Sequence, residues 1–193
     1  MNPIFAAALE LQDFCARHAW RFCFIGGIAV QRWSEPRLTQ DVELSLLTGF
    51  GSEARYVDLL LGSFSGRRPD AREFALKHRV LLLESVSGIP LDVALGAMPF
   101  EARAVERSSV FAVGAGASLQ TCSAEDLVVL KVLAGREKDW LDVEGVVLRQ
   151  GESLDTELVF RELEPLLELK EAPDAAIRLR AILAQAASRS RQS

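Results

Sequence analysis

The sequence is poor in the residues that build disulfide scaffolds and zinc sites. It has three cysteines, Cys15, Cys23 and Cys122, and two histidines among 193 residues. The cysteines are odd in number and scattered, and no Cys-x-x-Cys pair occurs. This pattern indicates reduced thiols and predicts a cytoplasmic location. Because no Cys/His ligand spacing is present, we expect no zinc site.

The sequence also has no long hydrophobic run and no internal repeat. No apolar run approaches the roughly 18 to 20 residues that a bilayer span needs, so we expect no membrane partner. The N-terminal segment carries Glu10 and Asp13 inside its apolar pattern and does not start with positive charge. We therefore do not expect a signal peptide.

The remaining composition is that of an ordinary globular protein. Hydrophobic residues make up 49%, charged residues 25%, and the formal net charge is −5. The length suffices to bury a core. A pI near 5.2 argues against a protein that coats nucleic acid without sequence preference. One segment, from Arg67 to Arg79, is basic, and it is either a solvated face or a local nucleic-acid contact.

The stretch from Phe24 to Leu46 is the centre of the predicted chemistry. It combines the end of an apolar strand (21–25), the glycine pair Gly26-Gly27, a short helix ending at Trp33 and a second strand. Glycine lets a ligand approach the backbone closely. The free N–H groups and positive dipole end of the following helix would then offer a seat for phosphate.

The second strand of this stretch carries Asp41 and Glu43, which alternation places on one face. Two neighbouring carboxylates repel each other unless positive charge lies between them, and Mg²⁺ is the natural candidate. A later apolar strand from Ile89 to Leu95 carries a single acid, Asp92, on the face opposite its apolar residues. The three acids predict a metal site. The alternatives are that Asp41 and Glu43 lie on a solvated strand edge and that Gly26-Gly27 is a simple turn.

The order of predicted elements indicates an α/β (α+β) fold. Residues 1–121 are expected to form a mixed β-sheet flanked by helices, residues 122–187 a C-terminal helical region, and residues 188–193 a flexible tail. Strands are predicted at 21–25, 80–83, 89–95, 110–113 and 118–121 besides the strand of Asp41, and helices at 4–18, 28–33, 52–62, 124–135, 139–149, 158–169 and 175–187.

These residues resemble a known family. The motif Arg37-x-Thr39-x-Asp41-x-Glu43, preceded by two glycines and followed by Asp92, is similar to that of the nucleotidyltransferase superfamily related to DNA polymerase beta. The superfamily commonly has Gly-Ser at the turn and Asp-x-Asp on the strand, where this chain has Gly-Gly and Asp-x-Glu. The segment 124–142 resembles the helical region of the AbiEii-type abortive-infection toxins.

The resemblance implies transfer of a nucleoside monophosphate from an NTP to an acceptor hydroxyl, with two Mg²⁺ ions as cofactors. It assigns Asp41, Glu43 and Asp92 to catalysis and metal binding. It further assigns nucleotide binding to Gly26, Gly27, Arg37, Thr39 and Lys131, and a cleft to Arg136, Lys138 and Asp139.

The acceptor and the biological setting stay open at this point. An RNA or tRNA end, a protein side chain and a small molecule such as an antibiotic are all compatible with the motif. The toxin-like second half suggests a toxin–antitoxin or phage-defence role with an antitoxin partner. Because the Gly-Gly and Asp-x-Glu variants depart from the common pattern, a catalytically inactive binding or scaffold protein is the alternative hypothesis.

Overall fold

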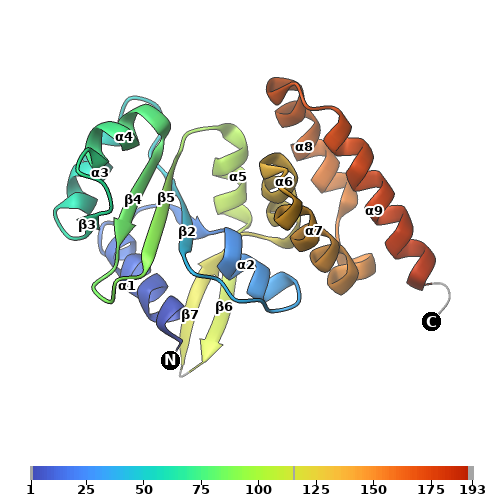
Figure 1. Ribbon diagram of the computed structural model, residues 1–193, viewed down its shortest axis with the longest axis horizontal. Coiled ribbons are helices and arrows are strands. Elements are labelled where there is room, and N and C mark those ends of the chain that lie inside the picture. Colours follow the sequence, from blue (N-terminus) through green and yellow to red (C-terminus); the bar gives the residue numbers. More distant parts are fainter. Residues whose placement is uncertain (1, 115, 191–193) are drawn as a thin grey trace. The chain divides into compact units, whose positions relative to one another are not determined.

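The computed structural model describes residues 2–114 and 116–190 (Figure 1). In chain order the elements are α1 (Pro3–Arg17), β1 (Phe22–Phe24), α2 (Gly26–Trp33), β2 (Val42–Leu47), α3 (Glu53–Leu61), β3 (Ser65–Gly66), α4 (Ala71–His78), β4 (Val80–Glu84), β5 (Pro90–Gly96), α5 (Pro99–Arg107), β6 (Ser109–Gly114), β7 (Ala117–Thr121), α6 (Ala124–Ala134), α7 (Glu137–Gln150), the 3₁₀-helix η1 (Gly151–Ser153), α8 (Thr156–Lys170) and α9 (Asp174–Ser190).

The chain divides into two compact units. The first comprises Met1–Ile28 and Leu38–Cys122, and the second comprises Ala29–Arg37 and Ser123–Ser193. The sequence predicted a boundary near residue 121 but placed residues 29–37 in the first part. In the structure this segment belongs with the helical unit.

The first unit is built on one mixed sheet, as the sequence predicted. Within the described residues the strand order is β3-β4-β5-β2-β1-β7-β6. The pairs β2–β5 and β1–β7 are parallel, and the other neighbours are antiparallel. Strands β4 and β5 form an antiparallel hairpin, with Leu82 opposite Asp92.

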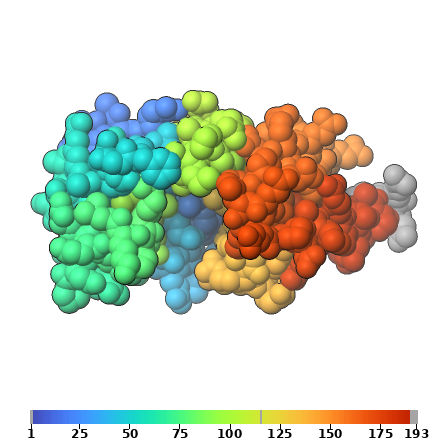
Figure 2. Space-filling model, turned by 90° about the horizontal axis from the view of Figure 1, so that it is seen from above, coloured from blue at the N-terminus to red at the C-terminus, as the bar shows by residue number. Residues whose placement is uncertain are grey.

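One face of this sheet carries the core of the first unit. Apolar residues at alternate positions of β2, β4 and β5 form a single buried cluster with the inner faces of α1, α3 and α4. Each strand therefore turns its hydrophobic set to these helices and its remaining side chains to the other face. On the molecular surface, α3 and α4 form a continuous cyan-to-green area of this unit (Figure 2).

Local sequence signals explain several element ends. The Asn2 side chain accepts a hydrogen bond of 3.0 Å from the Ile4 N–H, and Pro3 occupies the first helical position of α1. Ser123 likewise accepts from the Asp126 N–H at 3.1 Å, and α6 ends at Gly135 with φ +69°. Side-chain caps of this kind satisfy backbone donors that a helix start leaves open.

The helical unit consists mainly of α6 to α9. Its apolar interior includes Leu127 on α6, Val143 on α7 and Leu163 on α8, and α6 is buried on nearly all sides. Pro165 lies inside α8. Helix α9 continues to Ser190, so residues 188–190, expected in a flexible tail, are helical; residues 191–193 lie outside the described residues.

Further differences concern the first unit: helix α4 and the short strand β3 were not predicted. Helix α5 was not predicted; its buried residues are Phe100, Ala104 and Val105, and the side chain of Glu101 accepts from the Ala97 and Met98 N–H groups. The glycine pair is not a turn before α2 but its first two residues. Among the described residues, no helix combines the length and apolar character that a bilayer span requires.

Candidate functional site

The predicted carboxylates gather where β2 and β5 begin. These strands are parallel, and Glu43 lies directly beside Asp92 in their register. Their strand neighbours, such as Leu44 and Val93, belong to the core cluster, so both acids project from the opposite face. Asp41 immediately precedes β2, and its charge acts on Asp92.

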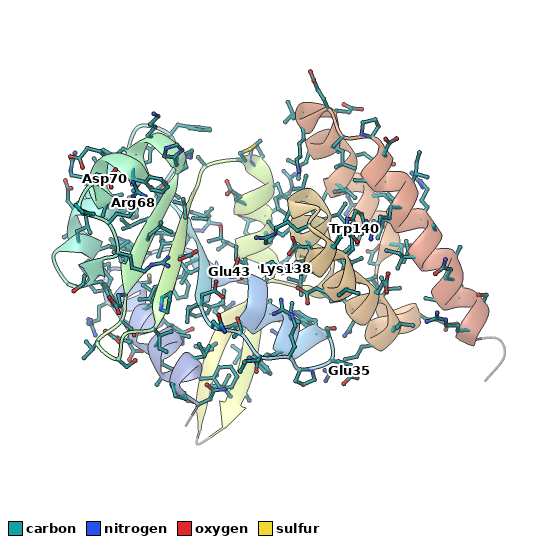
Figure 3. The ribbon with its side chains drawn as sticks, viewed as in Figure 1. Glu35, Glu43, Arg68, Asp70, Lys138 and Trp140 are labelled. Carbon is teal, nitrogen blue, oxygen red and sulfur yellow. The ribbon has the colours of Figure 1, made fainter. Side chains whose placement is uncertain are left out.

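The start of α2 lies against Glu43 (Figure 3). The Gly27 N–H donates a 3.1 Å hydrogen bond to Glu43 Oε2. A Cβ atom at Gly26 would lie 1.6 Å from the same oxygen, and one at Gly27 would lie 2.1 Å from Thr39 Oγ1. The two glycines are therefore required because side chains of the motif itself occupy the space beside them.

Thr39 links this glycine pair to Asp41. Its side chain is buried, at 8% exposure, and its hydroxyl lies 3.3 Å from both the Oδ1 and the main-chain oxygen of Asp41. The hydroxyl therefore restricts the orientation of the Asp41 carboxylate. The structure thus brings six predicted site residues together in the first unit: Gly26, Gly27, Thr39, Asp41, Glu43 and Asp92.

Replacing Gly26 by alanine tests this packing. Gly26 has φ +54°, where an L side chain costs about 1–2 kcal/mol, and its Cβ would also displace Glu43. Gly49→Ala is a matched control, because Gly49 has φ +74° with no atom within 4 Å of the added Cβ. In urea unfolding, Gly26→Ala is expected to lose about 1 kcal/mol more than Gly49→Ala, the value of the Gly27–Glu43 hydrogen bond. Equal losses would contradict the assigned contact.

The Asp92 carboxylate is not available to a metal ion in this structure, because Arg67 forms an ion pair with it. The side chains of Arg67 and Asp92 are 30% and 33% exposed. Burial raises the pKa of the Asp92 carboxyl above its ordinary value; the charge of Arg67 opposes this rise and the charge of Asp41 adds to it. Asp92 is therefore a partly buried acid whose charge is balanced by Arg67.

The donor set agrees with Mg²⁺, but its arrangement is not that of a closed metal site. Carboxylate oxygens are the ligands that Mg²⁺ prefers. However, across residues 2–114 and 116–190 no three side chains of His, Cys, Asp or Glu are grouped to hold a metal ion. Glu43 is held by the Gly27 N–H and Asp92 by Arg67. The residue types fit a divalent cation, provided that Arg67 releases Asp92.

Four of the other predicted residues, Arg37, Lys131, Arg136 and Asp139, form an ion network with Asp142 in the helical unit. The Lys131 ammonium lies 3.2 Å from Asp139 Oδ1 and 2.8 Å from Asp142 Oδ2. The Arg37 guanidinium donates to both oxygens of Asp142, at 2.6 and 2.7 Å. Arg136 donates to both oxygens of Asp139, at 2.6 and 3.2 Å. Three cations thus enclose two carboxylates.

This network makes Lys131 a structural residue in the present arrangement. The side chains of Lys131, Asp139 and Asp142 are only 7%, 0% and 3% exposed. Burial alone would raise the pKa of both carboxyls, but hydrogen bonds from Arg136, Arg37 and Lys131 outweigh it and hold the pKa of each below its ordinary value. Contact of Lys131 or Arg37 with phosphate stays a prediction.

Two members of these clusters were missed by sequence reasoning. Asp142 follows Asp139 at helical spacing, beside the inward Val143 and Val146, so its position on an apolar face was a usable signal. Arg67 had no such signal, since it stands in a run of basic residues. Lys138, predicted in the cleft, is exposed on α7 (Figure 3).

The basic segment is largely neutralised by acids of its own unit. Besides Arg67, three further arginines in it form ion pairs, and these pairs are Arg68–Asp70, Arg72–Asp58 and Arg79–Glu53. Figure 3 labels the first of them beside α4. Since each guanidinium faces a carboxylate, the segment offers less unbalanced positive charge than its sequence indicated.

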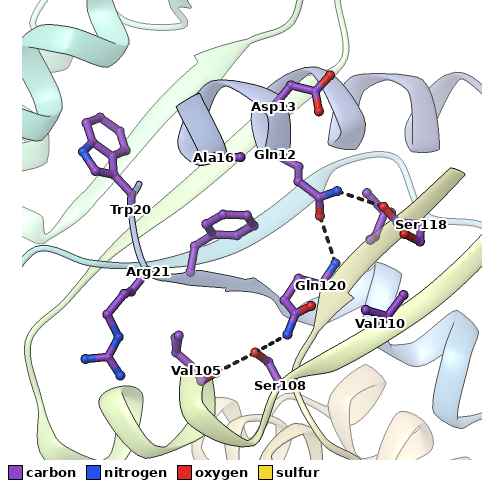
Figure 4. Close-up of a pocket in the computed structure, with 12 residues that line it drawn as sticks. Gln12, Asp13, Ala16, Trp20, Arg21, Val105, Ser108, Val110, Ser118 and Gln120 are labelled. Carbon is purple, nitrogen blue, oxygen red and sulfur yellow. Dashed lines mark hydrogen bonds between the residues drawn. The ribbon is translucent and has the colours of Figure 1, made fainter. Parts of the chain in front are cut away.

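A separate cavity of about 400 Å³ lies in the first unit between α1, α5 and the strands β6 and β7 (Figure 4). Its amides are already occupied: Gln12 donates to Ser118 O at 2.8 Å and accepts from the Gln120 N–H at 2.9 Å. The Gln120 amide donates to Ser108 Oγ at 2.9 Å. No predicted site residue is among the described residues lining this cavity, so it is distinct from the carboxylate group.

Comparison with known proteins adds a fold assignment. No protein-family profile matches the chain, and no curated protein sequence is significantly similar to it. Among solved structures, the antibiotic-resistance factor ANT(2'')-Ia superposes with a TM-score of 0.53 and 17% identity, over 88% of this chain and 94% of that one.

Two other structures superpose less closely. An antigenic nucleotidyltransferase-like protein from Paracoccidioides brasiliensis gives a TM-score of 0.48 and 16% identity, over 92% of this chain and 91% of that one. The lincosamide antibiotic adenylyltransferase LnuA with bound lincomycin gives a TM-score of 0.42 and 11% identity, over 72% of this chain and 92% of that one. The mixed sheet and the superposition with ANT(2'')-Ia together show a nucleotidyltransferase-like fold.

Proposed function

We propose that this protein is a metal-dependent nucleotidyltransferase, which transfers a nucleoside monophosphate from an NTP to an acceptor hydroxyl. The observation that carries the proposal is the in-register pair Glu43 and Asp92, with Asp41 adjacent, beside the glycine start of α2. This arrangement lies on a nucleotidyltransferase fold.

In this proposal Asp41, Glu43 and Asp92 hold divalent cations, Mg²⁺ by the chemistry of the donors. When bound, the metal supplies charge neutralisation at the transferring phosphoryl group and alignment of the attacking and leaving oxygens. Thr39 orients Asp41, Gly26 leaves room for Glu43, and Gly27 leaves room for Thr39. The chain itself therefore contributes mainly positioned negative charge, and no covalent intermediate is needed.

A small hydroxylated molecule is a second candidate for the acceptor, beside an RNA end or a protein side chain. The pairing of Arg68, Arg72 and Arg79 with acids reduces the open positive charge that a nucleic-acid acceptor would use. ANT(2'')-Ia, the structure with a TM-score of 0.53, is described as an antibiotic-resistance factor. A toxin role with an antitoxin partner stays a prediction from the sequence.

Ligand-dependent stability tests the proposal directly. The melting temperature of the protein is expected to rise with ATP or another NTP when Mg²⁺ is present, and to stay unchanged when EDTA replaces Mg²⁺. Linkage predicts about 2.7 kcal/mol of stabilisation when the ligand is at 100 times its dissociation constant. A scaffold protein without a working site would show no metal-dependent rise with any of the four NTPs.

A further inference from the structure

Arg67 reaches the carboxylate group from the edge of the sheet that β3 forms. It directly follows β3, and its N–H donates to Leu82 O of β4 at 3.0 Å. Leu82 pairs with Asp92 of β5, and Asp92 in turn lies beside Glu43 of β2. These four residues therefore form one row across four neighbouring strands, and the Arg67 side chain crosses β4 to pair with Asp92.

The side chains of this row share one face. Leu81 and Leu83 belong to the core, so Leu82 between them projects from the face that carries Asp92 and Glu43. On this face the three acids place like charges close together, which is unfavourable without a counter-charge. Arg67 supplies a positive charge to Asp92, and the Gly27 N–H supplies a positive dipole to Glu43.

We infer that Arg67 is an internal counter-ion of Asp92 which a divalent cation displaces, so that Arg67 sets the metal affinity of the site. Arg67 is a positioning residue in this inference, because it acts through Asp92. The inference rests on the proposed function. The inference explains why Asp41, Glu43 and Asp92 have the oxygen ligands that Mg²⁺ prefers and yet are not arranged as a metal site: the Asp92 carboxylate is paired with Arg67.

The geometry allows such an exchange. The main chain of Arg67 is held by its hydrogen bond to Leu82, while the long side chain is 30% exposed and can turn into solvent. Partly exposed ion pairs are weak, so a divalent cation with several oxygen ligands can compete for Asp92.

Mg²⁺ titration by calorimetry, without nucleotide, tests the inference on wild type and Arg67→Gln. Without the competing guanidinium, Arg67→Gln is expected to bind Mg²⁺ about five- to tenfold more tightly. Arg67→Lys retains a positive charge and should fall between the two. Arg68→Gln is the matched control: it removes the neighbouring arginine, which pairs with exposed Asp70, and should leave Mg²⁺ affinity unchanged.

The outcomes separate the inference from the proposed function. If wild type binds Mg²⁺ and both Arg67→Gln and Arg67→Met bind it equally or more weakly, the inference is wrong and the function stands. If wild type, Arg67→Gln and Arg67→Met all fail to bind Mg²⁺ without nucleotide, the inference is wrong, and the melting temperature with NTP and Mg²⁺ decides the proposed function separately. Circular dichroism shows whether each variant is folded. If Arg67→Gln does not fold, the Mg²⁺ affinity of Arg67→Met decides whether the inference holds.

Discussion

Replacing Asp41 by asparagine is expected to reduce nucleotidyl transfer about 10³-fold. A metal-held transition state is worth several kcal/mol, and each 1.36 kcal/mol corresponds to a factor of ten in rate. Asparagine keeps the size of the side chain and an oxygen that accepts from Thr39 Oγ1, so the local structure should persist. The change therefore removes the charge with little effect on packing.

The measurement is transfer of label from α-labelled NTPs into a cell extract, with the free energy of unfolding determined on the same preparations. Asp70→Asn is the matched control, since Asp70 is an exposed acid paired with Arg68 outside the carboxylate group. It is expected to keep wild-type transfer. Label incorporation by Asp41→Asn at more than a tenth of the wild-type rate would show that the assigned site is wrong.

Replacing Lys131 by methionine is expected to lower the free energy of unfolding by about 3–5 kcal/mol. Without Lys131, Asp139 keeps Arg136 and Asp142 keeps Arg37, but both arginines are partly exposed, so each acid loses its buried counter-charge. Here the Lys131 ammonium touches Asp139 and Asp142, which are almost entirely buried. Methionine preserves the apolar stem of the side chain, so the lower free energy of unfolding is caused by the missing charge and not by lost packing.

Lys138→Met provides the control for this prediction. Lys138 lies on the same helical unit but is exposed, so its replacement should change stability by less than about 0.5 kcal/mol. Urea unfolding with a common m-value for the three proteins is the required measurement. A loss below about 1 kcal/mol for Lys131→Met would mean that Arg37 and Arg136 alone balance the two acids.

The network also bears on the segment that leads to the acid strand. Arg37 lies four residues before Asp41, and its bidentate bond to Asp142 holds this end of the segment within the helical unit. Arg37 therefore has a clear structural role. In the sequence motif alone, the same arginine had been assigned to phosphate.

The sequence alone determined the features that depend on a few neighbouring residues. Alternation placed Glu43 and Asp92 on the face opposite the core, and the acids, glycines and Thr39 of the motif lie together as the resemblance implied. Capping residues marked the starts of α1 and α6. Alternation and capping act within one strand or one turn, so they needed no knowledge of distant residues, whereas the meeting of the acids with the glycines and Thr39 was implied only by the resemblance.

Only the tertiary structure decided which charge faces which. Arg67 and Asp92 are 25 residues apart, and Arg37 and Asp142 are 105 apart. Charge composition does not specify such pairs, because any exposed arginine could meet any acid until the strands and helices are packed. For the same reason, the burial of Lys131 between two carboxylates, and the closure of Asp92 by an arginine, could be known only once β3 to β5 and α6 to α7 were in place.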